Sequence, residues 1–419
     1  MNHLSITVRW ERLVAVVAVV AAALASATGC GKTPAFFVLN EVELTHREFT
    51  PDQQQTVANV LYAMFGTPDN PYILKATSLN PSKVIAASGP VWSDKQGRAR
   101  GIYRQQCGHC HGTSGDGDGP TAALLNPYPR DYRRGLFKFK STERAAQPTD
   151  ADLERVIRYG VPGTAMPAFD LLPKDEVAAL VEYVKYLSIR GQTEYALAAA
   201  ISDLGEDEKL ALDYPTLIES ILQPIAEKWE QANKQVIQPP AKPEVKLAES
   251  VDKGRELYYG TKANCVKCHG PSELGDGQTT DYDDWTKPLV EYAKEVHEGL
   301  RTIPSDPDLS SAQKSERLAE LEQLATAIED TTLPPRNILP RNLRSGIYRG
   351  GGRPLDLFRR ISAGINGVPM PGVGPATGTT GGVLSPDEIW HLVDYIQSLP
   401  YEPINQPPKP TSITGQGQM

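Results

Sequence analysis

Apolar residues recur at helical spacing in several separate stretches of the chain. The stretch Asp52–Phe65 carries one apolar stripe, which includes Met64 as a core residue, and a Gly-Thr-Pro-Asp turn follows it. The same spacing predicts helices over Asp150–Tyr159, Leu172–Leu187 and the segment ending at Leu399. No strand–helix–strand pattern interrupts them. The pattern therefore predicts an all-α fold.

The second half of the chain repeats the first. Leu357–Pro371 aligns without a gap on Leu153–Pro167, and the helix ending at Leu399 aligns on the one ending at Leu187. The repeat defines two domains, 97–191 and 249–402. A helical connector, 192–248, joins them, with helical stretches near Glu194–Ala211 and Pro215–Val236 and a Pro-rich extended spacer over 238–243.

The second copy contains an insertion over about 278–333 that the first copy lacks. Helical spacing predicts one helix at Leu289–Leu300 and an acidic one at Ser311–Glu329. The insertion is interpreted either as a lid packed on its own domain or as a docking element for a redox partner.

The two ends of the chain differ from the repeats. Residues 1–30 are typical of an export signal, because a polar, charged start precedes a Val/Ala-rich run and small residues precede Cys30. This end is similar to a bacterial lipoprotein signal, in which Cys30 is lipidated; the alternative is an uncleaved N-terminal membrane helix. Residues 31–96 form an N-terminal extension expected to lie over the first domain. Residues 403–419 predict a disordered tail.

Net charge and cysteine content limit which partners and which covalent cross-links the chain is expected to have. The 43 basic and 51 acidic residues give a net charge of −8, which argues mildly against nucleic acid as a partner. Four of the five cysteines lie in two short motifs, so disulfides are not the scaffold.

Those motifs are Cys107-Gly-His-Cys110-His111 and Cys265-Val-Lys-Cys268-His269. A Cys-x-x-Cys-His run is the attachment site of c-type haem, where the thiols form thioethers and the imidazole reaches the iron. A zinc site, a redox dithiol and a structural disulfide are the alternatives. They do not explain why both cysteine pairs end in His, and a thioredoxin-like dithiol would need a βαβ context.

With these motifs, residues 97–191 and most of 251–401 resemble a dihaem cytochrome c with two class I domains, of lipoprotein type. The resemblance implies two covalently bound haem c groups, with His111 and His269 as axial ligands. Met166 and Met370 are the expected sixth ligands, since each lies on a Gly/Pro loop after its motif. The family pattern also places a proline carbonyl, near Pro120, on the axial imidazole, and packs Gly101 and Tyr103 against the last helix.

Two arginines occupy equivalent positions beside proline in the two copies. Arg130 and Arg341 are candidates for binding haem propionates, because a buried propionate needs a charged hydrogen-bond donor. A plain surface role is the alternative.

Two six-coordinate irons would leave no open position for a substrate, so we expect an electron carrier rather than an enzyme. The resemblance implies a protein tethered on the periplasmic side of a bacterial membrane. There it would pass single electrons between a quinol-oxidising complex and a terminal oxidase. The alternative is an electron-accepting cytochrome subunit or domain of a periplasmic dehydrogenase or dihaem peroxidase. Neither nucleic acid nor a small-molecule substrate is expected.

Overall fold

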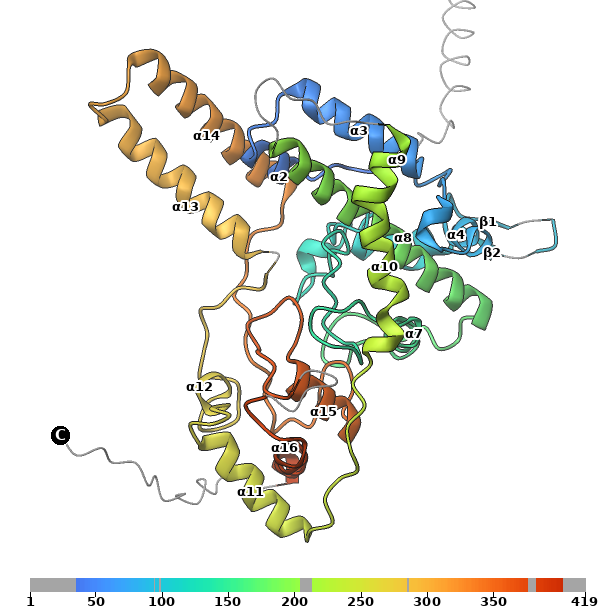
Figure 1. Ribbon diagram of the computed structural model, residues 1–419, viewed down its shortest axis with the longest axis vertical. Coiled ribbons are helices and arrows are strands. Elements are labelled where there is room, and N and C mark those ends of the chain that lie inside the picture. The colour runs from blue at the N-terminus through green and yellow to red at the C-terminus, as the bar shows by residue number, and fades with distance from the viewer. Residues whose placement is uncertain are drawn as a thin grey trace, which may run out of the picture. The chain divides into compact units, whose positions relative to one another are not determined.

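The computed structural model describes residues 35–401 apart from 94, 98, 204–212, 285 and 376–381. The predicted signal with Cys30 and the predicted tail 403–419 therefore lie outside the described residues. From Phe37 onward the chain forms one compact unit that carries both repeats. The fold is all-α, as predicted (Figure 1). Among the described residues the strands are β1 (Trp92–Ser93) and β2 (Ala99–Arg100), which pair antiparallel.

The helices follow the repeat. The N-terminal extension holds α2 (Glu41–His46), α3 (Pro51–Phe65) and α4 (Pro81–Ala87). The first repeat holds α5 (Ile102–Gln106), α6 (Gly108–His111), α7 (Asp150–Tyr159) and α8 (Lys174–Ser202). The connector holds α9 (Tyr214–Thr216), a π-helical turn (Leu217–Leu222) and α10 (Gln223–Glu230). The second repeat holds α11 (Leu247–Tyr259), α12 (Val266–His269), α13 (Lys287–Thr302), α14 (Ser311–Thr331), α15 (Pro354–Ala363) and α16 (Pro386–Ser398). Short 3₁₀ turns lie at Lys75–Thr77, Ala122–Leu124, Ala232–Gln235, Ile303–Ser305 and Leu399–Tyr401.

Helix α8 is the centre of the first core. The extension packs on it through α3 and α4, and the Tyr186 hydroxyl donates to the Phe65 carbonyl. Met64 is buried in this core, as predicted. The expected cover over the first domain is thus observed.

Helix α8 is longer than the sequence predicted. One helix ending at Leu187 and a separate one beginning near Glu194 were expected, but a single helix continues to Ser202. Gly191 lies against the neighbouring backbone, where an added Cβ would be 2.3 Å from Cα of Arg133. Arg190 and Glu194 form a buried ion pair at 2.9 Å. The glycine therefore permits close packing and does not end the helix.

The second core forms where α11 meets α16. Gly254 allows the approach, because a Cβ there would be 2.1 Å from the His391 carbonyl oxygen. Tyr258 and Tyr395 pack edge to face, with ring centroids 5.5 Å apart. The Pro-rich spacer lies along α16, where its Pro240 carbonyl accepts from the Trp390 indole at 3.1 Å.

The insertion forms a helical hairpin of α13 and α14, at the upper left of Figure 1. Its apolar residues pack on α2 of the N-terminal extension, with Val42, Val296 and Leu324 buried together. The ring of His46 stacks on Tyr292 with centroids 3.7 Å apart. The predicted lid on its own domain is therefore wrong, because the apolar stripe of α14 is covered by a segment far away in sequence. No helix in the described part of the chain is long and apolar enough to span a bilayer.

Candidate metal centres

Each Cys-x-x-Cys-His motif forms a single helical turn. Cys107 precedes α6 and Cys265 precedes α12, and each cysteine carbonyl accepts from the backbone N–H of the motif histidine at 2.9 Å. Both thiols and the imidazole of a motif are therefore held on one short, fixed piece of backbone. This is the arrangement that a covalently attached haem requires.

The imidazole of each motif is fixed by a main-chain carbonyl. Nδ1 of His111 lies 3.0 Å from the Arg130 oxygen, and Nδ1 of His269 lies 3.3 Å from the Arg341 oxygen. A carbonyl can only accept, so Nδ1 carries the hydrogen and Nε2 keeps the lone pair that a metal needs.

The expectation that a carbonyl near Pro120 binds the His111 imidazole is therefore wrong. The acceptor is the carbonyl of Arg130, the residue after Pro129. Gly117 explains the difference, because at φ 81° and without a Cβ it lets the 129–131 segment pass close beneath the motif. The bond from the Tyr132 N–H to the Gly115 carbonyl, 2.7 Å, then holds that segment.

Burial sets the protonation states of these groups. It lowers the pKa of His111 to about 4 and also lowers that of His269, so both rings are neutral near pH 7. Burial raises the pKa of Cys107 to about 12 and that of Cys265 to about 11. A redox dithiol needs a thiol pKa below the ordinary value, so these environments disfavour that alternative.

The four motif cysteines do not assemble into one site. Within the described ranges, no group of three or more His, Cys, Asp or Glu side chains is placed to hold a metal ion. The shared four-ligand zinc shell is therefore not formed.

A tyrosine hydroxyl braces each motif. Tyr103 donates to the Gly112 carbonyl at 2.9 Å, and Tyr258 donates to the Gly270 carbonyl at 2.8 Å. Tyr103 also packs on α8 through Tyr183, as expected. Gly101 does not pack there: it precedes α5, and an added Cβ would be 2.2 Å from the Pro90 oxygen.

The first motif has an aromatic neighbour that the sequence did not single out. Tyr132 stacks on His111 with centroids 4.8 Å apart, and Phe137 stacks on Tyr132 at 6.0 Å. Trp229 of the connector then meets Phe137 edge to face at 5.7 Å, so the connector packs on the first domain through this ring. The equivalent of Tyr132 in the second copy is Leu343, so this stack belongs to the first domain.

The second motif has a buried carboxylate instead. Glu273 follows His269 by four residues, where the first copy has Gly115. Its oxygens accept from the Arg344 guanidinium at 2.5 and 2.9 Å and from the Tyr395 hydroxyl at 2.7 Å. The residue is fully buried. The replacement of Gly115 by Glu273 at equivalent positions of the repeat is the sequence signal that could have indicated this buried carboxylate.

The two methionine loops have the same backbone. The Met166 carbonyl accepts from the Val161 N–H and the Met370 carbonyl from the Ile365 N–H, both at 3.1 Å. Each loop begins with a glycine at positive φ, Gly160 in the first domain and Gly364 in the second, where a Cβ would be 2.6 Å from the methionine oxygen. The ungapped alignment of these segments is confirmed in three dimensions.

The two arginine candidates lie differently. Burial lowers the pKa of Arg130 to about 10. The Arg341 guanidinium donates to the Ile347 carbonyl at 2.8 Å and lies beside Gly163 of the first methionine loop. Their backbone carbonyls bind the two imidazoles, a role that the sequence did not predict.

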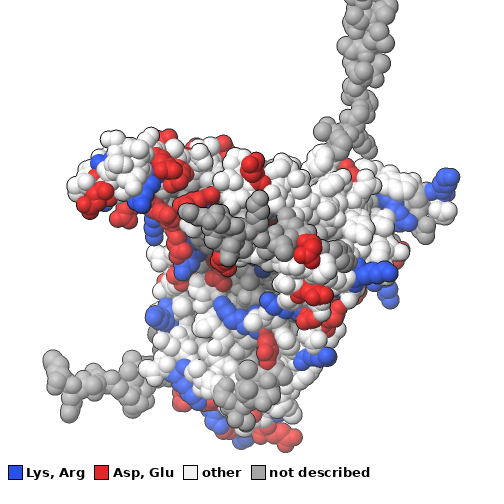
Figure 2. Space-filling view, turned by 45° about the horizontal axis from the view of Figure 1, so that its top comes forward, with Lys and Arg blue, Asp and Glu red and all other residues white. Residues whose placement is uncertain are grey.

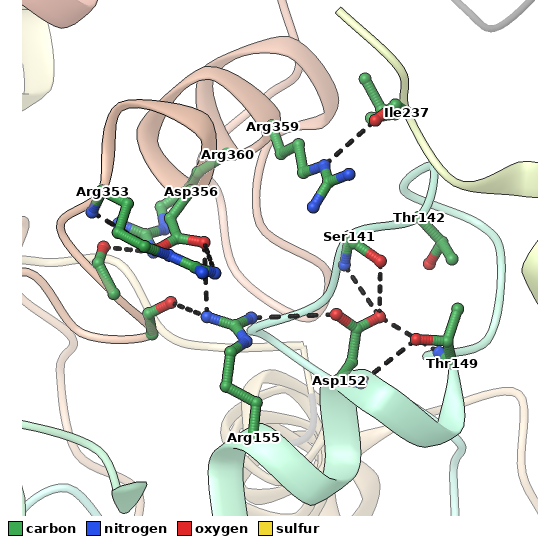
Figure 3. Close-up of polar contacts among 12 residues, drawn as sticks. Ser141, Thr142, Thr149, Asp152, Arg155, Ile237, Arg353, Asp356, Arg359 and Arg360 are labelled. Atoms are coloured by element: carbon green, nitrogen blue, oxygen red, sulfur yellow. Dashed lines mark hydrogen bonds and ion pairs between the residues drawn. The ribbon is translucent and has the colours of Figure 1, made fainter.

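Equivalent helices of the two domains, α7 and α15, share a polar network (Figure 3). Arg155 of α7 contacts Asp152 on its own helix at 3.8 Å and Asp356 of α15 at 3.5 Å. Asp356 also accepts from Arg353 at 2.9 Å. Burial alone would raise the pKa of Asp356, but the Arg353 hydrogen bonds and the Arg155 charge outweigh it and lower the pKa. Asp356 is therefore ionised at neutral pH.

Comparison with known proteins agrees with this geometry. The family model described as cytochrome c oxidase, cbb3-type, subunit III matches residues 94–184, and the cytochrome c model matches 251–400. Cytochrome c55X of Paracoccus denitrificans (strain Pd 1222) is 35% identical over 103 residues, 24% of this chain and 81% of that protein.

A solved structure, from the reducing HAO-like protein complex of Kuenenia stuttgartiensis, matches with 24% identity and a TM-score of 0.43. The match covers 74% of this chain and 97% of that one. A TM-score of this size does not indicate a shared function.

Proposed function

The chain belongs to the c-type cytochromes and is a dihaem cytochrome c whose two domains each bind one covalent haem c; from this premise we propose a periplasmic electron carrier tethered to a membrane. It passes single electrons between a quinol-oxidising complex and a terminal oxidase. The haem iron supplies the reversible one-electron change. The match of 94–184 to an oxidase subunit family supports an oxygen-reducing complex as partner.

The protein's own residues would attach the two haems through two motifs of the same geometry. Cys107 and Cys110 would attach the first haem, and Cys265 and Cys268 the second. His111 and His269 would each offer Nε2 to a haem iron, because their Nδ1 atoms are bound to carbonyls. Arg130 and Arg341 remain candidates for the propionates.

The observation that carries this proposal is the shared geometry of the methionine loops. Both methionines lie on rigid backbone of the same form, so Met166 and Met370 are the proposed sixth ligands. His/Met ligation stabilises ferrous iron and leaves no position open for a substrate. Electron transfer without catalysis at the haems follows.

The test uses the matured full-length protein. We expect a mass showing two haem additions and no tight carbon monoxide binding in the wild type. Met370→Ala should lower the potential and admit carbon monoxide at one haem only, with Met64→Leu, a change of a methionine in the first hydrophobic core, as the control. Tight carbon monoxide binding to wild type at both haems would contradict the ligand assignment. Recovery of a stoichiometric dehydrogenase, or peroxidase activity of the chain alone, would favour the subunit alternative.

The membrane tether is proposed to be a lipid on Cys30. A diacylglycerol anchor carries enough buried chain for stable attachment, whereas one acyl chain is marginal. The N-terminal mass of the native protein should begin at acylated Cys30. Retention of residues before Cys30 would instead indicate the helical anchor.

A further inference from the structure

Arg144 joins the first domain to the methionine loop of the second. Its Nη1 donates to the Met370 carbonyl at 2.5 Å and its Nη2 to the Val368 carbonyl at 2.9 Å. The planar guanidinium thus binds two main-chain oxygens of one loop, including that of the proposed axial ligand. Such a two-point contact fixes orientation as well as distance.

Arg144 projects from a segment that is itself tightly held. The Lys140 ammonium donates to the carbonyls of Glu143, Arg144 and Ala146. Ser141 donates through both N–H and Oγ to Asp152 of α7, each at 2.9 Å (Figure 3). The guanidinium is therefore presented in a fixed position and not by a flexible surface side chain.

The surrounding contact between the domains is also fixed. Arg155 donates to the Gly350 carbonyl at 2.6 Å and pairs with Asp356. The ring of Phe139 lies against Gly350, where a Cβ would be 2.4 Å from Cδ1. Arg144 is thus held opposite the Met370 loop by contacts on both sides of the interface.

The reciprocal contact on the first methionine loop is weaker. There Arg349 of the second domain donates one 3.3 Å bond to the Gly163 carbonyl, three residues before Met166. The second loop receives two shorter bonds, one of them at the methionine itself. The two proposed iron sites are therefore held unequally.

We propose that Arg144 is a positioning residue for the sixth ligand of the second haem and that its charge raises the potential of that haem. This inference rests on the proposed ligation of Met370. A fixed cation beside the ligand loop disfavours the additional positive charge of ferric iron. The two hydrogen bonds keep the loop from moving away, so that a competing ligand gains little access.

The experiment compares Arg144→Gln and Arg144→Lys with wild type in the full-length dihaem protein. Arg144→Gln should lower the reduced-to-oxidised ratio of one haem roughly tenfold at a fixed potential, ~59 mV for a one-electron couple. The haem affected should be the one altered by Met370→Ala. Its sulfur-to-iron charge-transfer band should weaken, and carbon monoxide binding should accelerate at that haem. Arg144→Lys keeps the charge but loses the planar fork that binds the two carbonyls in a fixed orientation, so it should preserve the potential of the second haem better than the stability of its ligand loop.

Two control variants separate this effect from general changes. Arg349→Gln removes a guanidinium from the same interface and should leave the second haem unchanged. Arg301→Gln removes an exposed positive charge on α13 and should alter neither haem. Arg144 variants with both potentials and carbon monoxide binding as in wild type, or with equal shifts at both haems, would overturn the role of Arg144. A wild-type second haem that lacks the sulfur-to-iron band would overturn the ligation of Met370, and the inference with it.

Discussion

Glu273 shows how one side chain can distinguish two otherwise similar domains. Its carboxylate lies beneath the second motif and is bound by Arg344 and Tyr395, while its own carbonyl accepts from the Leu343 N–H at 2.8 Å. It therefore ties the motif turn both to α16 and to the segment whose Arg341 carbonyl holds His269. In the first domain Gly115 occupies this position and the stack of Tyr132 on His111 serves instead.

Glu273→Ala should destabilise the second domain strongly. The change leaves the Arg344 guanidinium buried without its carboxylate, and breaking a buried ion pair in this way costs about 3–5 kcal/mol. Denaturant unfolding followed at the haem absorbance measures it. Glu249→Ala removes one partner of the exposed pair with Lys253 and should leave the midpoint unchanged. Equal midpoints for the two variants would show that the buried network contributes little.

At the scale of elements, α7 and α15 meet through a carboxylate that must be ionised. The folded state lowers the pKa of Asp356, so its contribution is present above the unfolded aspartate pKa of about 3.9 and is lost as pH falls through the folded value. The contact between the two domains should therefore weaken below about pH 4. Amide hydrogen exchange of α7 and α15, followed as the pH is lowered through about 4, measures this weakening. In Asp356→Asn the part of the pH dependence that comes from this carboxylate should disappear. Retention of the full acid transition in Asp356→Asn would assign it to another group.

Helices and loops were predicted correctly from the sequence where their structure depends on residues close together in the chain. Helix α7 has the predicted bounds, and the two methionine loops share the same hydrogen bond and glycine position, as the repeat indicates, because both follow from short-range spacing and glycine placement. The acceptor for His111 was missed, because Arg130 reaches the ring only when a loop folds beneath the motif. The burial of α14 on α2 was missed for the same reason: an apolar stripe shows that a partner exists but not which segment supplies it.

At the scale of the whole molecule, the α13–α14 hairpin is a segment with an excess of acidic side chains. Residues 287–331 contain ten acidic and five basic side chains, and red carboxylates cluster on the hairpin at the upper left of Figure 2. The contacts of His46 with Tyr292 and with Glu295, 3.3 Å, hold it on α2. A surface of this charge is suited to steer a basic partner toward the protein.

Electron transfer to a basic soluble cytochrome should therefore slow as salt rises. Screening shortens the reach of exposed charges to about 8 Å at physiological ionic strength. Glu316→Gln with Glu320→Gln should flatten the salt dependence measured by stopped flow. Glu249→Gln with Asp252→Asn makes the same change in net charge on α11 and should leave it steep. A response of both pairs to the same degree would mean that only net charge matters.

The meeting of α7 with α15 resembles the contact in a two-fold symmetric dimer, except that one chain supplies both halves. Asp152 and Arg155 recur at the equivalent positions Asp356 and Arg359, whereas Val156 is replaced by Arg360. In a dimer of identical subunits, a charge added at such a contact appears on both subunits, so it cannot make their two sites differ. Two domains fused in one chain are free of that restriction, because a substitution in one domain changes the charge around one iron and leaves the charge around the other iron unchanged. Covalent fusion thus permits an asymmetry between two otherwise matching centres, and a difference in potential between two centres gives an electron a preferred direction.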